Sequence, residues 1–140
     1  MDTLGSIGEI AVLQRLFPRL PEAESTLVGP GDDAAVLADF RRAWSSPFQL
    51  GWKAAVTNLS DVAAMGARPT ALLVALIAPA DTPVTDLEEL ADGFREACDA
   101  LAPGCGVVGG DLSVADSLPL AIPAFGSLDG RPPVLRSGAR

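Results

Sequence analysis

The sequence has no histidine and no tyrosine among its 140 residues. A Ser-His or Cys-His pair therefore cannot form within this chain, so nucleophilic catalysis of that type is excluded. Any chemistry must rest on carboxylates, lysine, arginine, backbone amides and bound metal. The two cysteines, Cys98 and Cys105, do not make a metal-binding motif, and we expect both to be reduced, buried thiols.

Long apolar runs and an excess of positive charge are also absent. The longest apolar run, Ala71 to Ala80, is too short to span a bilayer. The N-terminal MDTLGSIGEI shows no basic region followed by an apolar core, so we expect no signal peptide, no membrane partner and a cytoplasmic protein. With 18 acidic and 10 basic residues and a net charge of -8, the chain is a poor candidate for binding nucleic acid. An anionic ligand would need bridging cations.

The apolar content of 49% argues against disorder, and the length suffices for one domain with a core. Capping boxes at Ser6–Glu9 and Thr85–Glu88 predict two helices, and the pattern over 51–65 predicts a third. Four short strands are expected, over 34–37, 70–77, 107–108 and 118–125, the last in an edge or irregular position because of Pro119 and Pro123. Alternating strands and helices predict an α/β or α+β domain.

Three segments place an aspartate at the end of an element or on the rim of a helix. They are Gly31-Asp32-Asp33 before a strand, Asn58-Leu59-Ser60-Asp61 within a helix, and Gly109-Gly110-Asp111 after a strand. Magnesium prefers carboxylate and phosphate oxygens, so aspartates that converge from separate elements could hold ions that bridge the phosphates of a nucleotide.

Each segment also has a simpler interpretation. A Gly-Asp-Asp turn usually has no role beyond the turn itself. Asp61 falls on a helix face that could simply be exposed to solvent, and Gly109-Gly110 could be a tight turn. Asn58 is more informative, because its neighbours on the helical wheel are apolar and its amide should need a partner. Composition and spacing therefore make a metal site plausible and go no further.

The run Asn58-Leu-Ser-Asp-Val-Ala-Ala-Met-Gly-Ala-Arg-Pro69 resembles the signature of thiamine-monophosphate kinases, in the superfamily of aminoimidazole ribonucleotide synthetase. The other landmarks follow in the same order: Gly8-Glu9, Gly31-Asp-Asp-Ala-Ala-Val-Leu37, Gly109-Gly-Asp111 and Arg136-Ser-Gly-Ala139. The resemblance runs over nearly the whole chain. It implies the N-terminal domain of that fold, an α+β domain with a mixed sheet, flanking helices and a β-barrel formed with a second copy.

The resemblance also implies an activity: transfer of the γ-phosphoryl group of ATP to thiamine monophosphate, assisted by Mg²⁺, in a homodimer. By position, Asp33, Asp61 and Asp111 match metal ligands. Gly110 and Asp111 match a turn that contacts the nucleotide, and Arg136 matches a contact to ATP phosphate. No acid–base side chain is implied, because a phosphate oxygen is already a nucleophile at neutral pH.

The sequence departs from the family pattern in two places. The family has a further strand, with Ser-Thr-Asp and His-Phe, where this chain passes from Leu37 to Phe40 without room for one. Either a segment near residues 37–40 was lost from the written sequence or the chain has a true deletion. The first is favoured, because a missing central strand would leave sheet edges unpaired. Residues 136–140 begin a loop, so we expect residues 1–140 to be a single N-terminal ATP- and magnesium-binding domain whose C-terminal partner domain is absent.

Two alternatives stay open. One is another enzyme of the same superfamily, such as the hydrogenase maturation factor or a purine-pathway synthetase. The other is a dimerisation module without catalytic activity, since a fragment of this length could keep the interface and lose turnover. We expect residues 1–140 to be inactive by themselves.

Overall fold

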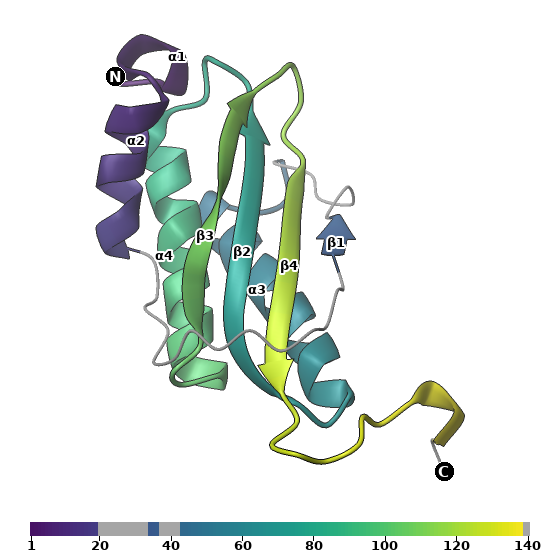
Figure 1. The fold of residues 1–140 in the computed structure, drawn as a ribbon. Coiled ribbons are helices and arrows are strands. Elements are labelled where there is room, and N and C mark those ends of the chain that lie inside the picture. The colour runs from purple at the N-terminus through teal and green to yellow at the C-terminus, as the bar shows by residue number, and fades with distance from the viewer. Residues whose placement is uncertain (20–33, 37–42, 139–140) are drawn as a thin grey trace.

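The computed structural model describes residues 1–19, 34–36 and 43–138. Its helices and strands follow one another as drawn in Figure 1. The helices are α1 (Leu4–Ile7), α2 (Glu9–Leu16), α3 (Pro47–Ala64) and α4 (Val84–Leu101), with 3-10 helices η1 (Phe17–Arg19) and η2 (Arg136–Gly138). The strands are β1 (Ala34–Val36), β2 (Arg68–Ala78), β3 (Gly106–Val114) and β4 (Leu120–Ser127).

Within the described residues, the four strands form one mixed sheet in the order β1-β4-β2-β3. β2 and β3 are parallel and are joined by the crossover helix α4, whereas β4 runs antiparallel to both β1 and β2. Both α3 and α4 lie behind the sheet in the view of Figure 1, and α1 and α2 lie beside α4. The predicted α+β fold with a mixed sheet and flanking helices is confirmed.

The core lies between the sheet and the helices. Leu72 and Leu76 of β2 are buried there with Leu112 of β3, and Phe94 of α4 is fully buried in the same cluster. Burying one such side chain stabilises the fold by about 1.5–3 kcal/mol. Because successive strand residues point to opposite faces, Leu73 and Ala75 lie on the face away from the helices, whereas Val74 packs against the core with Leu72 and Leu76. No helix of the described residues is long and apolar enough to cross a membrane.

Both predicted capping boxes are wrong, although the helices exist. The box at the N-terminus joins Thr3 and Ser6 and starts α1, and Gly8 (φ 80°) then separates α1 from α2. Helix α4 begins after Pro83 without a side-chain cap. Helix α3 has a box that was not predicted, between Ser46 and Gln49, so it starts at Pro47 rather than at residue 51.

Two strand predictions also need correction. Gly109, Gly110 and Asp111 lie inside β3 rather than after it, because parallel pairing with β2 continues from Gly106 to Val114. The strand with Pro123 is central, between β1 and β2. The pairing of β4 with β2 links Ala124 to Leu72 and Ala121 to Ala75 without a partner for Pro123, which has no N–H to donate.

Helices α3 and α4 cross closely through two glycines. A Cβ atom on Gly51 would overlap the carbonyl oxygen of Leu90, and a Cβ atom on Gly93 would overlap the carbonyl oxygen of Phe48. The two backbones are therefore in contact where they cross. A side chain at either position would have to push the helices apart.

We predict that Gly51→Ala or Gly93→Ala lowers the free energy of unfolding by about 2–3 kcal/mol, because the added methyl group has no space. Urea unfolding followed by circular dichroism measures this change. Gly138→Ala is the matched control, since no atom of the described residues beyond its chain neighbours lies within 4 Å of the site of its Cβ, and it should stay within about 0.5 kcal/mol of the parent. Equal stability of all three variants would show that the helices do not cross as described.

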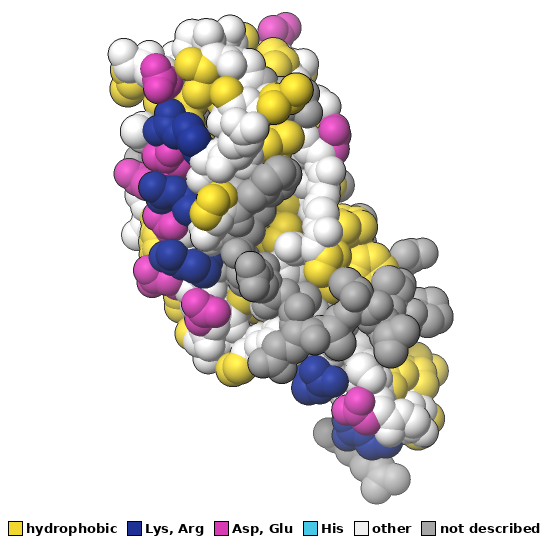
Figure 2. All heavy atoms as spheres, turned by 60° about the vertical axis from the view of Figure 1, so that its left-hand side comes forward, with side chains coloured by type: hydrophobic (Ala, Val, Ile, Leu, Met, Phe, Trp, Pro, Cys, Tyr) yellow, Lys and Arg dark blue, Asp and Glu magenta, His cyan; other side chains and the backbone are white. Residues whose placement is uncertain are grey.

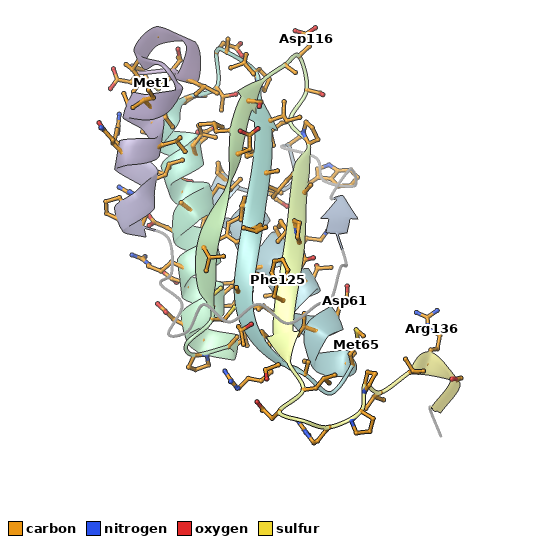
Figure 3. All side chains as sticks on the ribbon, viewed as in Figure 1. Met1, Asp61, Met65, Asp116, Phe125 and Arg136 are labelled. Atoms are coloured by element: carbon orange, nitrogen blue, oxygen red, sulfur yellow. The ribbon has the colours of Figure 1, made fainter. Side chains whose placement is uncertain are left out.

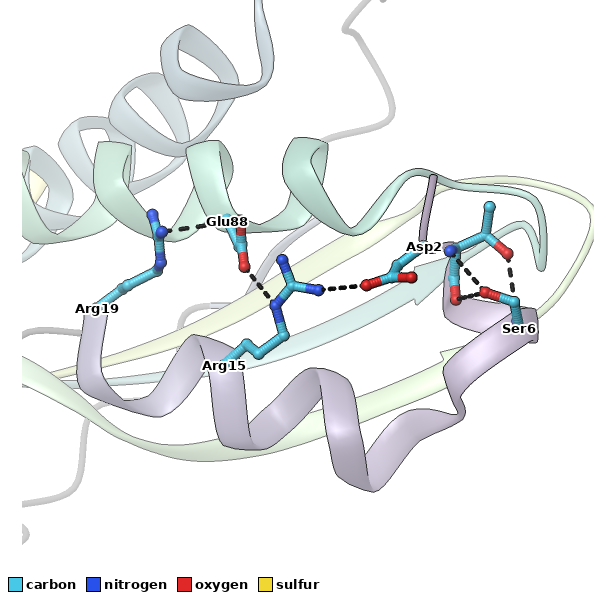
Figure 4. A network of polar contacts seen from close by, with 6 residues as sticks. Asp2, Ser6, Arg15, Arg19 and Glu88 are labelled. Carbon is cyan, nitrogen blue, oxygen red and sulfur yellow. Dashed lines mark hydrogen bonds and ion pairs between the residues drawn. The ribbon is translucent and has the colours of Figure 1, made fainter.

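A row of ion pairs fastens α2 and η1 to α4 (Figure 4). Arg15 Nε lies 2.6 Å from Glu88 Oε1, and Arg19 Nη1 lies 2.7 Å from Asp92 Oδ2. Glu88, only 13% exposed, lies between the two arginines, because Arg19 Nη2 is 3.7 Å from its second oxygen. Figure 2 shows basic and acidic side chains alternating along this side of the molecule.

We expect Glu88→Gln to lower the free energy of unfolding by about 1–2 kcal/mol, because two arginines would share a neutral, half-buried acceptor. The loss should shrink between low salt and 1 M NaCl. Glu89→Gln, one residue further along the same helix and exposed, is the control. If Glu88→Gln and Glu89→Gln unfold at the same urea concentration in low salt, the ion pairs contribute nothing measurable.

Candidate functional site

Asp61 lies in the last turn of α3, with its side chain exposed. Asn58, one turn earlier, is 2% exposed, and its Nδ2 donates a hydrogen bond to the carbonyl oxygen of Ala54 at 2.9 Å. The prediction that the amide of Asn58 needs a partner is confirmed, and the partner is the backbone of its own helix. Helix α3 therefore buries Asn58 in the core and presents Asp61 to solvent.

Asp111 lies in the middle of β3, opposite Ala75 of β2. Its neighbour Leu112 is buried in the core, so Asp111 points to the face of the sheet away from α3 and α4. The carboxylate is exposed and accepts a hydrogen bond from Ser113 Oγ at 2.6 Å. Asp111 and Ser113 thus form a small polar group on a sheet face that is otherwise mostly apolar.

Gly110 has a packing role that the sequence did not reveal. A Cβ atom at this position would overlap the carbonyl oxygen of Val74 on the neighbouring strand. Only glycine lets β3 approach β2 here, whether or not a nucleotide binds nearby. The predicted contact of Gly110 with a nucleotide stays a prediction.

Arg136 lies at the start of η2, in the segment that follows β4, and it is exposed. This segment is attached to the turn between α3 and β2: the N–H of Val134 donates to the carbonyl oxygen of Met65 at 2.9 Å. Figure 3 shows Asp61, Met65 and Arg136 at the same end of the domain, whereas Asp116 lies at the opposite end. The structure therefore brings two of the predicted site residues, Asp61 and Arg136, to one end of the domain.

The described residues do not assemble the full predicted metal site. Among residues 1–19, 34–36 and 43–138, no three Asp, Glu or Cys side chains form a group that could hold a metal ion. Asp33 lies outside the described residues, and β1 begins with the next residue, Ala34, opposite Pro123 of β4. Asp61 and Asp111 are exposed carboxylates, the donor type that Mg²⁺ prefers, but they come from different layers of the fold.

An apolar cavity of about 350 Å³ lies between α2, α4 and strands β2 and β3. Its walls are mainly leucine, valine and phenylalanine side chains. Among the described residues of its lining, Asp111 is the one charged residue, and its side chain points to the other face of the sheet. Walls of this kind cannot by themselves bind a triphosphate. The sequence did not predict the cavity, because its walls come from segments far apart in the chain.

The face of the sheet away from α3 and α4 carries a row of partly exposed apolar side chains. In the part of the chain that the structure describes, no helix covers this face (Figure 1). The row extends from β2 to β4 and consists of Leu73, Ala75, Ile77, Ala121, Pro123 and Phe125.

The two cysteines are buried and form no disulfide, as predicted. A hydrogen bond between the thiols of Cys98 and Cys105, together with burial, raises the pKa of Cys98. This thiol therefore stays protonated at neutral pH, and its place at the end of α4 is structural.

Residues 25–128 match the family model described as AIR synthase related protein, N-terminal domain. This chain belongs to that family. It is 41% identical to thiamine-monophosphate kinase of Mycobacterium tuberculosis over 155 aligned positions, which cover 99% of this chain and 46% of the relative. The resemblance predicted from the motif around Asp61 is therefore confirmed.

Solved structures agree with this assignment. The crystal structure of thiamine monophosphate kinase from Aquifex aeolicus has a TM-score of 0.71 and 28% identity, covering 98% of this chain and 46% of that one. A structure described as "AaThiL complexed with AMPPCP and TMP" has a TM-score of 0.64 at 28% identity, covering 88% of this chain and 42% of that one. The chain spans about half the length of the relatives it matches.

Proposed function

We propose that this chain is the nucleotide-binding, N-terminal part of a kinase that uses ATP to convert thiamine monophosphate to thiamine diphosphate. The observation that carries the proposal is the 41% identity to a thiamine-monophosphate kinase across 99% of the chain. A related structure holds AMPPCP and TMP, an ATP analogue together with the expected acceptor. The motif order from Gly8-Glu9 to Arg136 agrees with this assignment.

The proposed reaction is a direct in-line transfer. An oxygen of the phosphate of thiamine monophosphate forms a bond to the γ-phosphorus of ATP, the bond from that phosphorus to the bridging oxygen breaks, and ADP leaves. A phosphate oxygen needs no general base at neutral pH, which agrees with a chain that has no histidine. The role left to the protein is to position the two substrates and to offset their negative charge.

In this proposal Asp61 and Asp111, with Asp33, hold Mg²⁺, and Arg136 contacts an ATP phosphate. Bound Mg²⁺ supplies positive charge that offsets the charge on the transferring phosphoryl group. The exposed carboxylates of Asp61 and Asp111 suit that role, because neither has a cationic side chain beside it among the ion pairs of the described residues. Gly110, next to Asp111, is proposed to contact the nucleotide.

We further propose that the chain acts as one domain of a longer, cytoplasmic enzyme. The alignment with the Mycobacterium relative extends over 155 positions, more than the 140 residues of this chain, so that relative has residues in this region that the chain lacks. This supports the predicted loss of a segment, for which residues 37–40 are the proposed place. The remaining half would supply most of the acceptor pocket.

We predict that Asp111→Asn in the intact protein lowers kcat by roughly two orders of magnitude or more, as expected when one donor that stabilises transition-state charge is lost. The melting temperature should change little, because Asp111 is exposed. ADP release at several Mg²⁺ concentrations measures the effect. Asp116→Asn, an exposed carboxylate at the other end of the domain, is the control.

Asp61→Asn should behave like Asp111→Asn in the same assay. Near-normal turnover of either variant at limiting Mg²⁺ would remove that residue from the metal site. A wild-type protein that dimerises but binds no MgATP would instead support the alternative of a dimerisation module.

We propose that the chain forms a homodimer through the open face of its sheet. Leu73, Ile77 and Phe125 form an apolar surface there that a second copy could cover, closing the two sheets into the expected barrel. Isologous pairing of one face with itself is the commonest way in which such chains associate.

We expect Phe125→Glu to convert the dimer to a monomer, because a buried charge without a partner would face the second copy. Analytical ultracentrifugation of the intact protein reads this directly. Val114→Glu, which replaces an exposed valine near the end of β3, is the matched control and should leave the dimer intact. A dimer that persists in Phe125→Glu would place the interface elsewhere.

A further inference from the structure

The segment between β4 and η2 has little of its own to hold it in place. Residues 129–138 are all exposed, and the only regular element there is the single turn of η2. A segment of this kind keeps one position only if specific bonds tie it to the domain. Its attachment therefore decides where Arg136 lies.

Two bonds tie the segment to the turn after α3. Arg131 Nη2 donates to the carbonyl oxygen of Gly66 at 3.0 Å, and the N–H of Val134 donates to the carbonyl oxygen of Met65 at 2.9 Å. Between these anchors stand Pro132 and Pro133, whose rings restrict the backbone. The two hydrogen bonds and the two prolines restrict residues 131–134, which we call the arm and which end two residues before Arg136.

The acceptor side of these bonds belongs to the end of α3. The N–H of Met65 donates to the carbonyl oxygen of Asp61 at 3.3 Å, so the turn that receives the arm is bonded to the turn that carries Asp61. Carbonyl oxygens at the C-terminus of a helix lack partners within the helix, and a cation there is favourable. Arg131 supplies both a donor and a positive charge at this point.

We propose that Arg131 is a positioning residue: it fixes the segment that carries Arg136 to the end of α3, so that Arg136 and Asp61 act on one nucleotide. This inference rests on the proposed function, in which Arg136 contacts an ATP phosphate. The planar guanidinium suits the task, because its Nε donates to the carbonyl oxygen of Leu128 at 3.2 Å while Nη2 reaches Gly66. Lysine cannot make both bonds from one rigid plane.

The kinetic test compares Arg131→Ala, Arg136→Ala and the double variant in the intact protein. Arg131→Ala should raise the KM for ATP roughly tenfold, within the range of coupling between neighbouring residues, and leave the KM for thiamine monophosphate nearly unchanged. Arg131→Lys should show nearly the same increase in the KM for ATP as Arg131→Ala. The double variant should be no worse than Arg136→Ala, because Arg131 acts through Arg136. Arg95→Ala is the control, because Arg95 lies on α4 and its ion pairs, to Asp92 and Glu96, stay within that helix.

A second readout does not depend on turnover. Trypsin can cut after Arg136 but not readily after Arg131, which is followed by proline. Arg131→Ala should therefore speed cleavage at Arg136 several-fold without a change in melting temperature. Val134→Pro, which removes the N–H bonded to Met65 and leaves Arg131 in place, should speed it as well.

The outcomes separate the inference from the proposed function. The positioning role alone would be overturned if Arg131→Ala left both the KM for ATP and the rate of trypsin cleavage at Arg136 unchanged while Arg136→Ala lowered turnover. Effects that multiply in the double variant would also overturn it, since Arg131 would then act independently. If the wild-type protein had no ATP turnover with thiamine monophosphate, the proposed function would fail. The inference would fail with it, even if faster cleavage in Arg131→Ala still showed the attachment.

Discussion

The pairing of β2 with both of its neighbours is the constraint on which the rest of the structure depends. Parallel pairing with β3 requires a crossover connection, which α4 provides, and antiparallel pairing with β4 brings the end of the chain back beside the start of β2. The turn between α3 and β2 then lies next to the residues that follow β4. The contact between the segment after β4 and Met65 follows from this register.

The close crossing of α3 and α4 lets both helices pack on one face of the sheet. Gly51 and Gly93 let the two helix backbones touch, so both helices fit behind a sheet of four strands. The opposite face stays free of helices in the described part of the chain, and it carries apolar side chains such as Leu73 and Phe125. One face thus builds the core, and the other is the face that we propose a second copy of the chain covers.

The candidate site is spread over elements that meet only in the folded domain. Asp61 belongs to the helix layer, Asp111 to the open face of the sheet, and Arg136 to a segment held by hydrogen bonds. Residues of one nucleotide site can come from such different places because a triphosphate is long and its metal ions can bridge several carboxylates. An acidic chain can bind an anionic ligand if metal ions bridge its carboxylates to the phosphates of that ligand.

The sequence by itself determined the fold class, the helices over α3 and α4, the long apolar strand β2 and the burial of Asn58, because hydrophobic periodicity is a local signal. The family motif around Asp61 could also be read without coordinates. The caps at Thr3 and Ser46 join residues three apart, so they are local features that the sequence analysis missed. Only the tertiary structure decided that Gly109-Gly110-Asp111 lies within a strand and that the proline-containing β4 is central. These features depend on which strands pair and which backbones touch. Contacts between residues far apart in the chain leave no periodic trace in the sequence.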